Sequence, residues 1–153
     1  MLPAPRSARY LATWFGCGNS PLAPGTAGSI ATLPLHWLLR ASGPFPQVVV
    51  CVLLTGAGVW AADRVVKAGT DQDPSHVVID EVVGTLISLG LAPRGWAPQL
   101  AALVLFRVLD IVKPGVIDRS QTLKPAGLGI MADDVLAGLG AGLLVKAACK
   151  LLR

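Results

Sequence analysis

Five carboxylates stand within or beside the apolar stretches of this chain, where ionised side chains are costly. They are Asp80, Glu81, Asp110, Asp133 and Asp134. A carboxylate in apolar surroundings is unfavourable unless it is paired or bound to a cation, and five gathered together would repel one another. Oxygen-only ligands suit a hard divalent ion. The pattern therefore predicts a Mg²⁺ site with these acids as metal ligands, in which Asp110 is either a ligand or a general base.

Two cations share a helix side with one of these acids. Arg107, Asp110 and Lys113 are spaced three residues apart, so they face the same way on a helix. A salt-bridge row is one interpretation. However, Arg107 follows the uninterrupted apolar run 101–106, which favours a buried cation beside a metal-binding acid, as phosphate binding requires. The predicted catalytic residues are therefore Asp80, Glu81, Arg107, Asp110 and Lys113.

A glycine-rich segment, residues 16–29, precedes the first long apolar stretch. Glycines leave backbone N–H groups able to face an anion, and a helix N-terminus follows the segment. No Gly-Lys-Ser/Thr triplet occurs in it, so it is not a nucleotide-binding loop, and a plain Gly/Pro turn is the alternative. The predicted phosphate-binding residues are Asn19, Ser20, Gly25, Thr26, Gly28 and, from the loop before the acidic pair, Asp73.

Other phosphatase chemistries fit the sequence poorly. The three cysteines are Cys17, Cys51 and Cys149. They form no disulfide or zinc pattern, and none is followed six residues later by the arginine that a cysteine-based phosphatase needs. Asp71 and Asp73 match an aspartate-nucleophile motif, but that chemistry follows a β-strand, and no strand pattern precedes them. His36 is expected to be a packing residue, whereas His76 directly precedes the acidic region and is left open as a site residue.

The elements that must position these residues are read as helices. The apolar stretches cover residues 28–39, 45–62, 77–92, 98–112 and 135–152. None alternates with a period of two, and Gly- and Pro-rich breaks separate them. We therefore predict one domain over residues 1–153, an all-α compact bundle of about five or more short, strongly apolar helices, either embedded in a membrane or associated with one.

Short connections favour helices that run up and down in sequence. This arrangement places the five carboxylates, Asp73 and the glycine-rich segment at one end of the bundle. The opposite end then holds only cations: Arg40, Arg94, Lys150 and Arg153. More cations fall at the acidic end than opposite, so the acidic end is predicted to lie on the cytoplasmic side of a membrane.

The composition points to a membrane or to a tightly packed helical oligomer. The chain is 53% hydrophobic and 14% charged, with a net charge of +4. That charge is too small and scattered for nucleic-acid binding but suits contact with anionic lipid. No signal peptide is expected at the N-terminus. The stretches are shorter than the roughly 20 residues of a confident span, which leaves a soluble homo-oligomer open, and Gly138 and Gly142 could allow close helix packing.

Three blocks of the sequence match a known pattern. They are residues 16–29, Asp73 followed by 78–84, and 106–114 followed by 117–119 and 127–138. In these blocks the chain resembles the phosphatidylglycerophosphatase A family. The resemblance implies an all-α fold and Mg²⁺-dependent hydrolysis of the phospholipid phosphatidylglycerophosphate to phosphatidylglycerol at the bacterial inner membrane. The chain departs from the family where Pro74-Ser75 replaces His-Gly and where Ile79 replaces a tryptophan.

In the predicted mechanism, the pairs Asp80–Glu81 and Asp133–Asp134 supply the metal ligands. The metal would polarise the phosphoryl oxygen and activate water. Arg107 and Lys113 would neutralise phosphoryl oxygens, and the loop from Asn19 to Thr26 would cradle the phosphate or the glycerol. The alternative from another class is a non-enzymatic membrane cation carrier or channel with carboxylates inside its helices.

Overall fold

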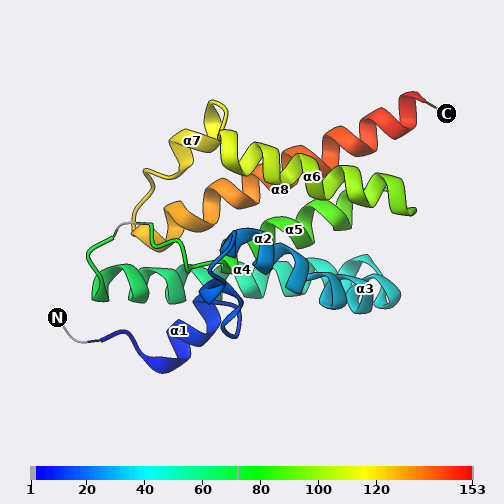
Figure 1. Ribbon diagram of the computed structural model, residues 1–153. Coiled ribbons are helices and arrows are strands. Elements are labelled where there is room, and N and C mark those ends of the chain that lie inside the picture. Colours follow the sequence, from blue (N-terminus) through cyan, green and yellow to red (C-terminus); the bar gives the residue numbers. More distant parts are fainter. Residues whose placement is uncertain (1–2, 72, 153) are drawn as a thin grey trace.

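The computed structural model describes residues 3–71 and 73–152, and every regular element within them is helical (Figure 1). The elements are α1 (Arg6–Ala12), the 3₁₀ turn η1 (Cys17–Asn19), α2 (Pro24–Ala31), α3 (Leu33–Ser42), α4 (Pro44–Ala68), α5 (Ile79–Leu91), α6 (Trp96–Val112), α7 (Val116–Ser120) and α8 (Ala126–Leu151). The prediction of an all-α bundle is confirmed. Of the cations predicted opposite the acids, Arg153 lies outside the described residues.

The helix boundaries differ from the predicted ones in two places. The first predicted stretch is divided into α2 and α3, because Pro34 near the start of α3 has no N–H to continue the α2 hydrogen-bond pattern. The last helix begins at Ala126, just after Pro125, and not at 135. The sequence also predicts that Asp133 and Asp134 stand at the start of this helix, and that prediction is wrong: they lie in its third turn, because the apolar pattern is interrupted at the acids while the helix continues through them.

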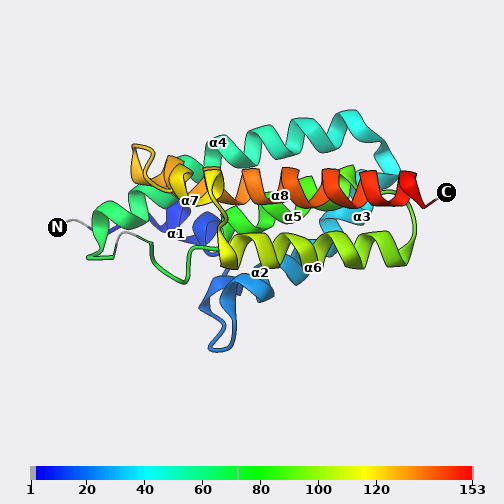
Figure 2. The ribbon, with the colours of Figure 1, turned by 90° about the horizontal axis from the view of Figure 1, so that it is seen from above.

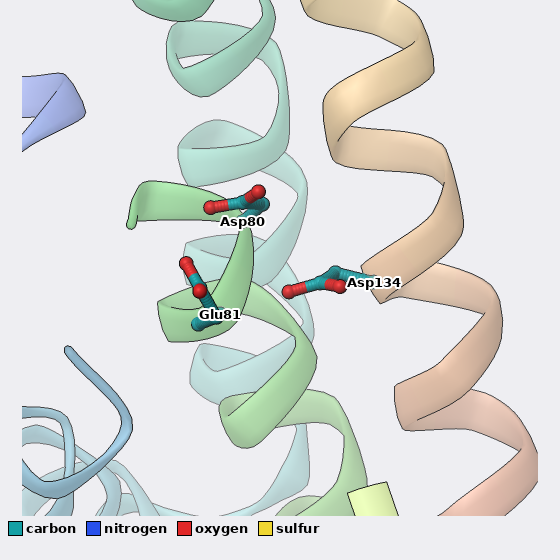
Figure 3. Close-up of side chains that lie close together, drawn as sticks. All are labelled: Asp80, Glu81 and Asp134. Atoms are coloured by element: carbon teal, nitrogen blue, oxygen red, sulfur yellow. The ribbon is translucent and has the colours of Figure 1, made fainter. Parts of the chain in front are cut away.

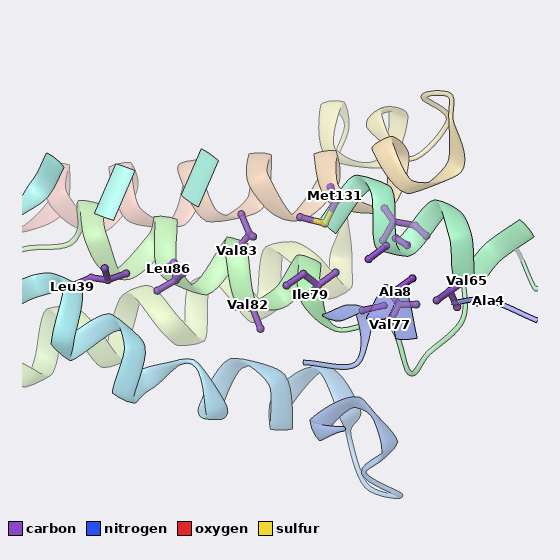
Figure 4. Packing of buried hydrophobic residues seen from close by; sticks show 14 residues of the cluster. Ala4, Ala8, Leu39, Val65, Val77, Ile79, Val82, Val83, Leu86 and Met131 are labelled. Carbon is purple, nitrogen blue, oxygen red and sulfur yellow. The ribbon is translucent and has the colours of Figure 1, made fainter. Parts of the chain in front are cut away.

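Helix α5 is the centre of the bundle and packs against α4, α6 and α8 (Figures 1 and 2). Most of its residues from Ile79 to Leu89 are buried. The main apolar cluster follows α5 along its length and joins α1 to the C-terminal half of α4, where Ala8 and Val65 meet (Figure 4). Because α5 is enclosed on several sides, side chains in its first turn are held rigidly against α6 and α8.

Small residues let α5 and α8 approach closely. A Cβ atom on Gly138 would lie 2.5 Å from the backbone oxygen of Gly84, and one on Gly142 would lie 2.8 Å from that of Ser88. The weak small-residue pattern in the sequence therefore marks a real contact surface. It also sets the separation of the acids that the two helices carry.

Replacing Gly138 with valine is expected to lower the free energy of unfolding by about 2–4 kcal/mol, because the side chain would push α8 away from α5. Thermal unfolding in a mild detergent measures the loss. Gly140→Ala is the matched control, since its Cβ would meet only Leu109 at an ordinary 3.4 Å. Equal melting temperatures for Gly138→Val and Gly140→Ala would contradict this packing.

The two ends of the bundle differ in charge. The site end is defined here as the start of α5, the end of α6 and the first three turns of α8. The far end is defined as the α3–α4 junction, the α5–α6 connection and the last turns of α8, which Figure 2 shows together. Carboxylates occupy the site end, while Arg40, Arg94 and Lys146 stand at the far end.

Helices α4 and α8 are each long and apolar enough to cross a membrane by length and composition. In the apolar window of α4 only 22% of residues are buried, against 56% for α8. Large apolar side chains are also exposed on α3, α6 and the outer face of α8. The outer surface of the bundle is thus unusually apolar, as a membrane-associated protein requires.

Candidate metal and phosphate site

Three carboxylates from two helices converge at the site end. Asp80 and Glu81 come from the first turn of α5 and Asp134 from the third turn of α8 (Figure 3). Each offers one oxygen, and these oxygens lie within 4.8 Å of one another. This spacing is short enough for all three oxygens to touch one cation.

The same three side chains carry buried oxygen atoms that lack partners. Within the described residues, Asp80 Oδ1, Glu81 Oε2 and Asp134 Oδ2 are buried and accept no hydrogen bond. A buried oxygen without a partner is costly, and an ionised one more so. A hard cation that prefers oxygen ligands would satisfy all three, so the residues present fit a divalent metal such as Mg²⁺.

The pKa values of Asp80 and Glu81 reflect this crowding of buried acids. Burial, and then the neighbouring charges of Glu81 and Asp134, raise the pKa of Asp80 well above its ordinary value. Burial also raises the pKa of Glu81, although its hydrogen bond with Asp80 and the charge of Arg107 act in the opposite direction. Without a cation, the folded protein therefore holds protons that an unfolded chain would release.

We expect the metal-free protein to lose stability as the pH rises. Above about pH 4 the unfolded chain gives up the Asp80 proton that the folded chain retains, so the unfolded state binds fewer protons and stability falls up to the raised pKa. The melting temperature in EDTA should therefore fall as the pH rises from about 4. Added Mg²⁺ should reverse this trend, because it binds the ionised form. A melting temperature in EDTA that rises over this interval would contradict the assignment.

The other two acids of the site pair with cations. Arg107 donates from Nη1 to Asp110 Oδ2 at 2.6 Å and lies 3.6 Å from Glu81 Oε1. Lys113 Nζ pairs with Asp133 Oδ2 and also donates to the side-chain oxygen of Gln121 at 3.1 Å. Among the described residues, Asp110 and Asp133 thus each hold one cation closely, Glu81 has a looser contact with Arg107, and Asp80 and Asp134 pair with none.

The position of Lys113 depends on the way α6 ends. Lys113 caps α6 with a left-handed backbone (φ 47°), which ends the helix and lets the chain turn back toward α8. Burial by itself lowers the pKa of Lys113, but the hydrogen bond to Asp133 and the negative charges of Asp133 and Asp110 raise it overall. Lys113 therefore stays charged at the edge of the acidic group.

Asp110 and Asp133 are not members of the group of three close oxygens in the described part of the chain. Asp133 also accepts a hydrogen bond from the backbone N–H of Asp134 at 3.0 Å, which fixes its orientation. Their assignment as direct metal ligands therefore stays a prediction. What the structure shows is that each of them holds a cation beside the site.

The N-terminus of α2 faces the same group. Ala23 precedes α2 in a left-handed conformation (φ 46°), Pro24 opens the helix, and among the described residues no side chain caps it. A Cβ on Gly25 would lie only 2.0 Å from Glu81 Oε1 and 2.9 Å from Arg107 Nη2. Only glycine leaves room here, so the first turn of α2 lies directly against Glu81 and Arg107, and a helix N-terminus is a favourable place for an anion.

Two cavities open on either side of Asp80. One of about 320 Å³ is lined by Pro24, Gly25, Glu81, Arg107 and Asp110, among other residues. The other, of about 120 Å³, is lined by Gln121 and Lys124 of the connection between α7 and α8 and by residues of α8, among others. Asp73, Asp80 and Lys113 line both cavities. The predicted position of Asp73 beside the acids is therefore correct.

The structure separates the remaining predicted phosphate-binding residues. Asn19 lines a different cavity, with Arg6, Arg9 and His76. Ser20 donates to the backbone oxygen of Leu22, and Thr26 is exposed in the first turn of α2. Gly28 packs against α5: its Cβ would lie 3.0 Å from Val78 Cβ. Packing thus accounts for Gly28, and phosphate binding by these four residues stays a prediction.

Two polar residues at the site were not among the predicted ones. Gln121 accepts a hydrogen bond from Lys113, and Lys124 lines the smaller cavity with Asp133. Their signal in the sequence was weak, because they lie in the segment between α7 and α8 that carries no apolar periodicity. His36 is buried at the far end, as the expected packing role requires.

An all-helical bundle with buried, partnerless carboxylate oxygens beside an arginine, a lysine and a helix N-terminus has the features of an enzyme that handles phosphate groups. Comparison with known proteins agrees: the family model described as phosphatidylglycerophosphatase A matches residues 10–149. The chain belongs to this family of lipid phosphatases. Membership of a phosphatase family sets aside the alternative of a non-enzymatic carrier or channel.

Three named relatives are similar to this chain over most of their length. A phosphatidylglycerophosphatase A of Escherichia coli is 38% identical over 138 residues, covering 88% of this chain and 79% of the relative. One of Haemophilus influenzae is 37% identical over 139 residues, covering 90% and 85%. A Bacteroides thetaiotaomicron protein named "Putative phosphatidylinositol-3-phosphatase" is 41% identical over 150 residues, covering 90% and 91%. No solved structure matches the chain significantly.

Proposed function

We propose that this protein hydrolyses the terminal phosphate monoester of phosphatidylglycerophosphate and that it uses Mg²⁺ to do so. The observation that carries the proposal is the set of three buried, unpartnered carboxylate oxygens on Asp80, Glu81 and Asp134. The family description and the names of two relatives support the substrate.

Asp80, Glu81 and Asp134 would hold the Mg²⁺ ion, since their oxygens are close together and all three are oxygen ligands. When bound, the ion supplies a Lewis acid that withdraws charge from the phosphoryl oxygens and makes a bound water more acidic. The donor set contains no cysteine or histidine, which favours Mg²⁺ over zinc.

The chain's own cations and backbone would position the phosphate. Arg107 and Lys113 line the larger cavity and would neutralise the phosphoryl oxygens, while the first N–H groups of α2 donate to the same anion. Asp110 and Asp133 hold these two cations in place. Asp110 uses Oδ2 for Arg107, so its Oδ1 is the atom we assign to accept a proton from the attacking water.

A phosphate-release assay tests the substrate. Purified protein would be given phosphatidylglycerophosphate, phosphatidylinositol-3-phosphate or phosphatidic acid in mixed micelles, each with Mg²⁺ or with EDTA. We expect the highest kcat/KM on phosphatidylglycerophosphate and no turnover in EDTA. The name of the Bacteroides relative makes the inositol lipid the specific rival. A higher kcat/KM on that lipid would replace the proposed substrate, and turnover in EDTA would remove the role of the metal.

The proposed location is the inner membrane, with the site end on the cytoplasmic side. The exposed apolar side chains of α4, α6 and α8 support contact with lipid. The cations at the site end support its orientation: they are Arg6, Arg9, Arg64, Lys67, Lys113, Arg119 and Lys124. Alkaline carbonate washing of membranes tests the location, and release of the protein into the supernatant would favour the soluble homo-oligomer instead.

A further inference from the structure

The far end of the bundle contains a cavity that collects positive charge. It has a volume of about 310 Å³, and Arg40 of α3, Arg94 of the α5–α6 connection and Lys146 of α8 line it. The nine acidic residues of the sequence are Asp63, Asp71, Asp73, Asp80, Glu81, Asp110, Asp118, Asp133 and Asp134. None of these side chains lines the cavity or pairs with its three cations within the described residues. The cavity therefore has excess positive charge and no internal counter-ion.

A buried histidine also lines this cavity. His36 lines it and is only 1% exposed. Its Nε2 lies 3.4 Å from Arg40 Nη1, and because arginine can only donate, Nε2 is the accepting atom and Nδ1 carries the hydrogen. Nδ1 is buried and has no hydrogen-bond partner within the described residues. Gln99 lies beside the ring and acts to raise the pKa of His36, and its amide nitrogen donates to the backbone oxygens of Leu89 and Pro93, at 3.1 Å each.

The charges of the cavity act on one another. Burial, and then the charge of Arg94, lower the pKa of Arg40. Burial, and then the charge of Arg40, lower the pKa of His36. Both shifts show that further positive charge is unfavourable here, so an anion bound among these donors would relieve the repulsion.

An apolar groove continues from the cationic cavity. It has a volume of about 280 Å³ and runs between α4 and α5, with Leu139 of α8 on one side. The cavity and the groove share Pro44, Gln47, Gly90 and Leu91. The remaining lining residues of the groove are Val48, Cys51, Val52, Leu86 and Ile87, all apolar. The outer face of α4 that borders the groove is exposed, so a hydrocarbon chain could enter it from a membrane.

We propose that the far end is a second lipid-binding site, which holds an anionic glycerophospholipid with its phosphate in the cationic cavity and one acyl chain in the adjoining groove. The charge of the cavity selects an anion, and the apolar groove selects a lipid over a free ion. Arg94 lies thirteen residues after Glu81 along α5 and its connection, roughly 20 Å at the helical rise. The site is thus separate from the carboxylates, and it does not depend on the proposed function.

Native mass spectrometry from a neutral detergent tests the head-group contacts. The probe is phosphatidylglycerol, a phosphodiester with no monoester to cleave, and phosphatidylcholine is the neutral comparison. We expect the wild type to retain phosphatidylglycerol preferentially and Arg40→Gln/Arg94→Gln to bind it about tenfold or more weakly. Lys150→Gln is the matched control, because Lys150 also lies in the last turns of α8 but does not line the cavity. If the double variant does not fold, the exposed Lys146 provides Lys146→Gln as a second variant.

A second pair of variants tests the groove. Val52→Trp would fill it and should weaken phosphatidylglycerol retention, whereas Val49→Trp on the same helix lies outside the groove and should not. Phosphatase activity of Lys146→Gln should match the wild type, which separates this site from the catalytic one. Equal retention of the neutral and anionic lipids, unchanged retention in the charge variants, or full displacement of the lipid by equimolar inorganic phosphate would each overturn the proposal.

Discussion

Replacing Asp80 with asparagine should lower phosphate release by about a thousandfold or more and, in the same protein, raise the melting temperature of the metal-free form. The two effects have one cause. Asp80 lies among Glu81, Asp134 and Asp133, and burial together with these charges makes its ionised form unfavourable. Asparagine removes a negative charge that is costly without a cation but is needed to bind one.

The magnitude follows from the role of the ion. A bound divalent metal contributes several kcal/mol to stabilising charge in a phosphoryl-transfer transition state, and about 4 kcal/mol corresponds to a thousandfold change in rate. Thermal unfolding in EDTA and in Mg²⁺ measures the effect of the ion on stability. Mg²⁺ should raise the melting temperature of the wild type and raise that of Asp80→Asn much less.

Asp71→Asn is the matched control, because Asp71 is an exposed aspartate in the loop before α5 and belongs to the rival aspartate-nucleophile motif. We expect it to keep wild-type turnover and the wild-type response to Mg²⁺. Near-normal turnover in Asp80→Asn would contradict the metal site. Loss of turnover in Asp71→Asn alone would favour the rival motif.

Replacing Gly25 with alanine should lower kcat/KM by about a hundredfold or more while leaving the fold stable. The added Cβ would lie 2.0 Å from Glu81 Oε1 and 2.9 Å from Arg107 Nη2, so a metal-site carboxylate and a phosphate-binding cation would both have to move. The backbone of α2 itself accepts alanine, and alanine in a helix is more favourable than glycine by about 1 kcal/mol. Activity should therefore fall without a matching fall in melting temperature.

Gly56→Ala adds the same methyl group in the middle of α4, where nothing lies within 4 Å of the new atom. It should match the wild type in kcat/KM and equal or exceed it in melting temperature. A Gly25→Ala protein with wild-type kcat/KM would show that the close approach of α2 to Glu81 has no part in catalysis.

Much of the fold could be predicted from the sequence because apolar periodicity reports helices directly. The central helix α5 and helix α6 were placed within a few residues, since each is a nearly continuous apolar run. The start of α8 was missed because Gly127, Gly129 and the paired aspartates interrupt that pattern. Helices α1 and α7 were missed because each is short and mostly exposed, so neither carries a clear apolar stripe.

For the site, the sequence by itself determined which residues could do the chemistry: carboxylates in apolar segments, cations spaced three apart and a glycine-rich segment before a helix. Residue type and local spacing suffice for this, because an ionised side chain in an apolar segment is costly in any fold unless it is paired or bound to a cation. Only the tertiary structure decided which buried carboxylate oxygens lack a partner and which acids hold Arg107 and Lys113. That division depends on distances between helices far apart in the sequence, and those distances are set by close contacts such as Gly84 against Gly138.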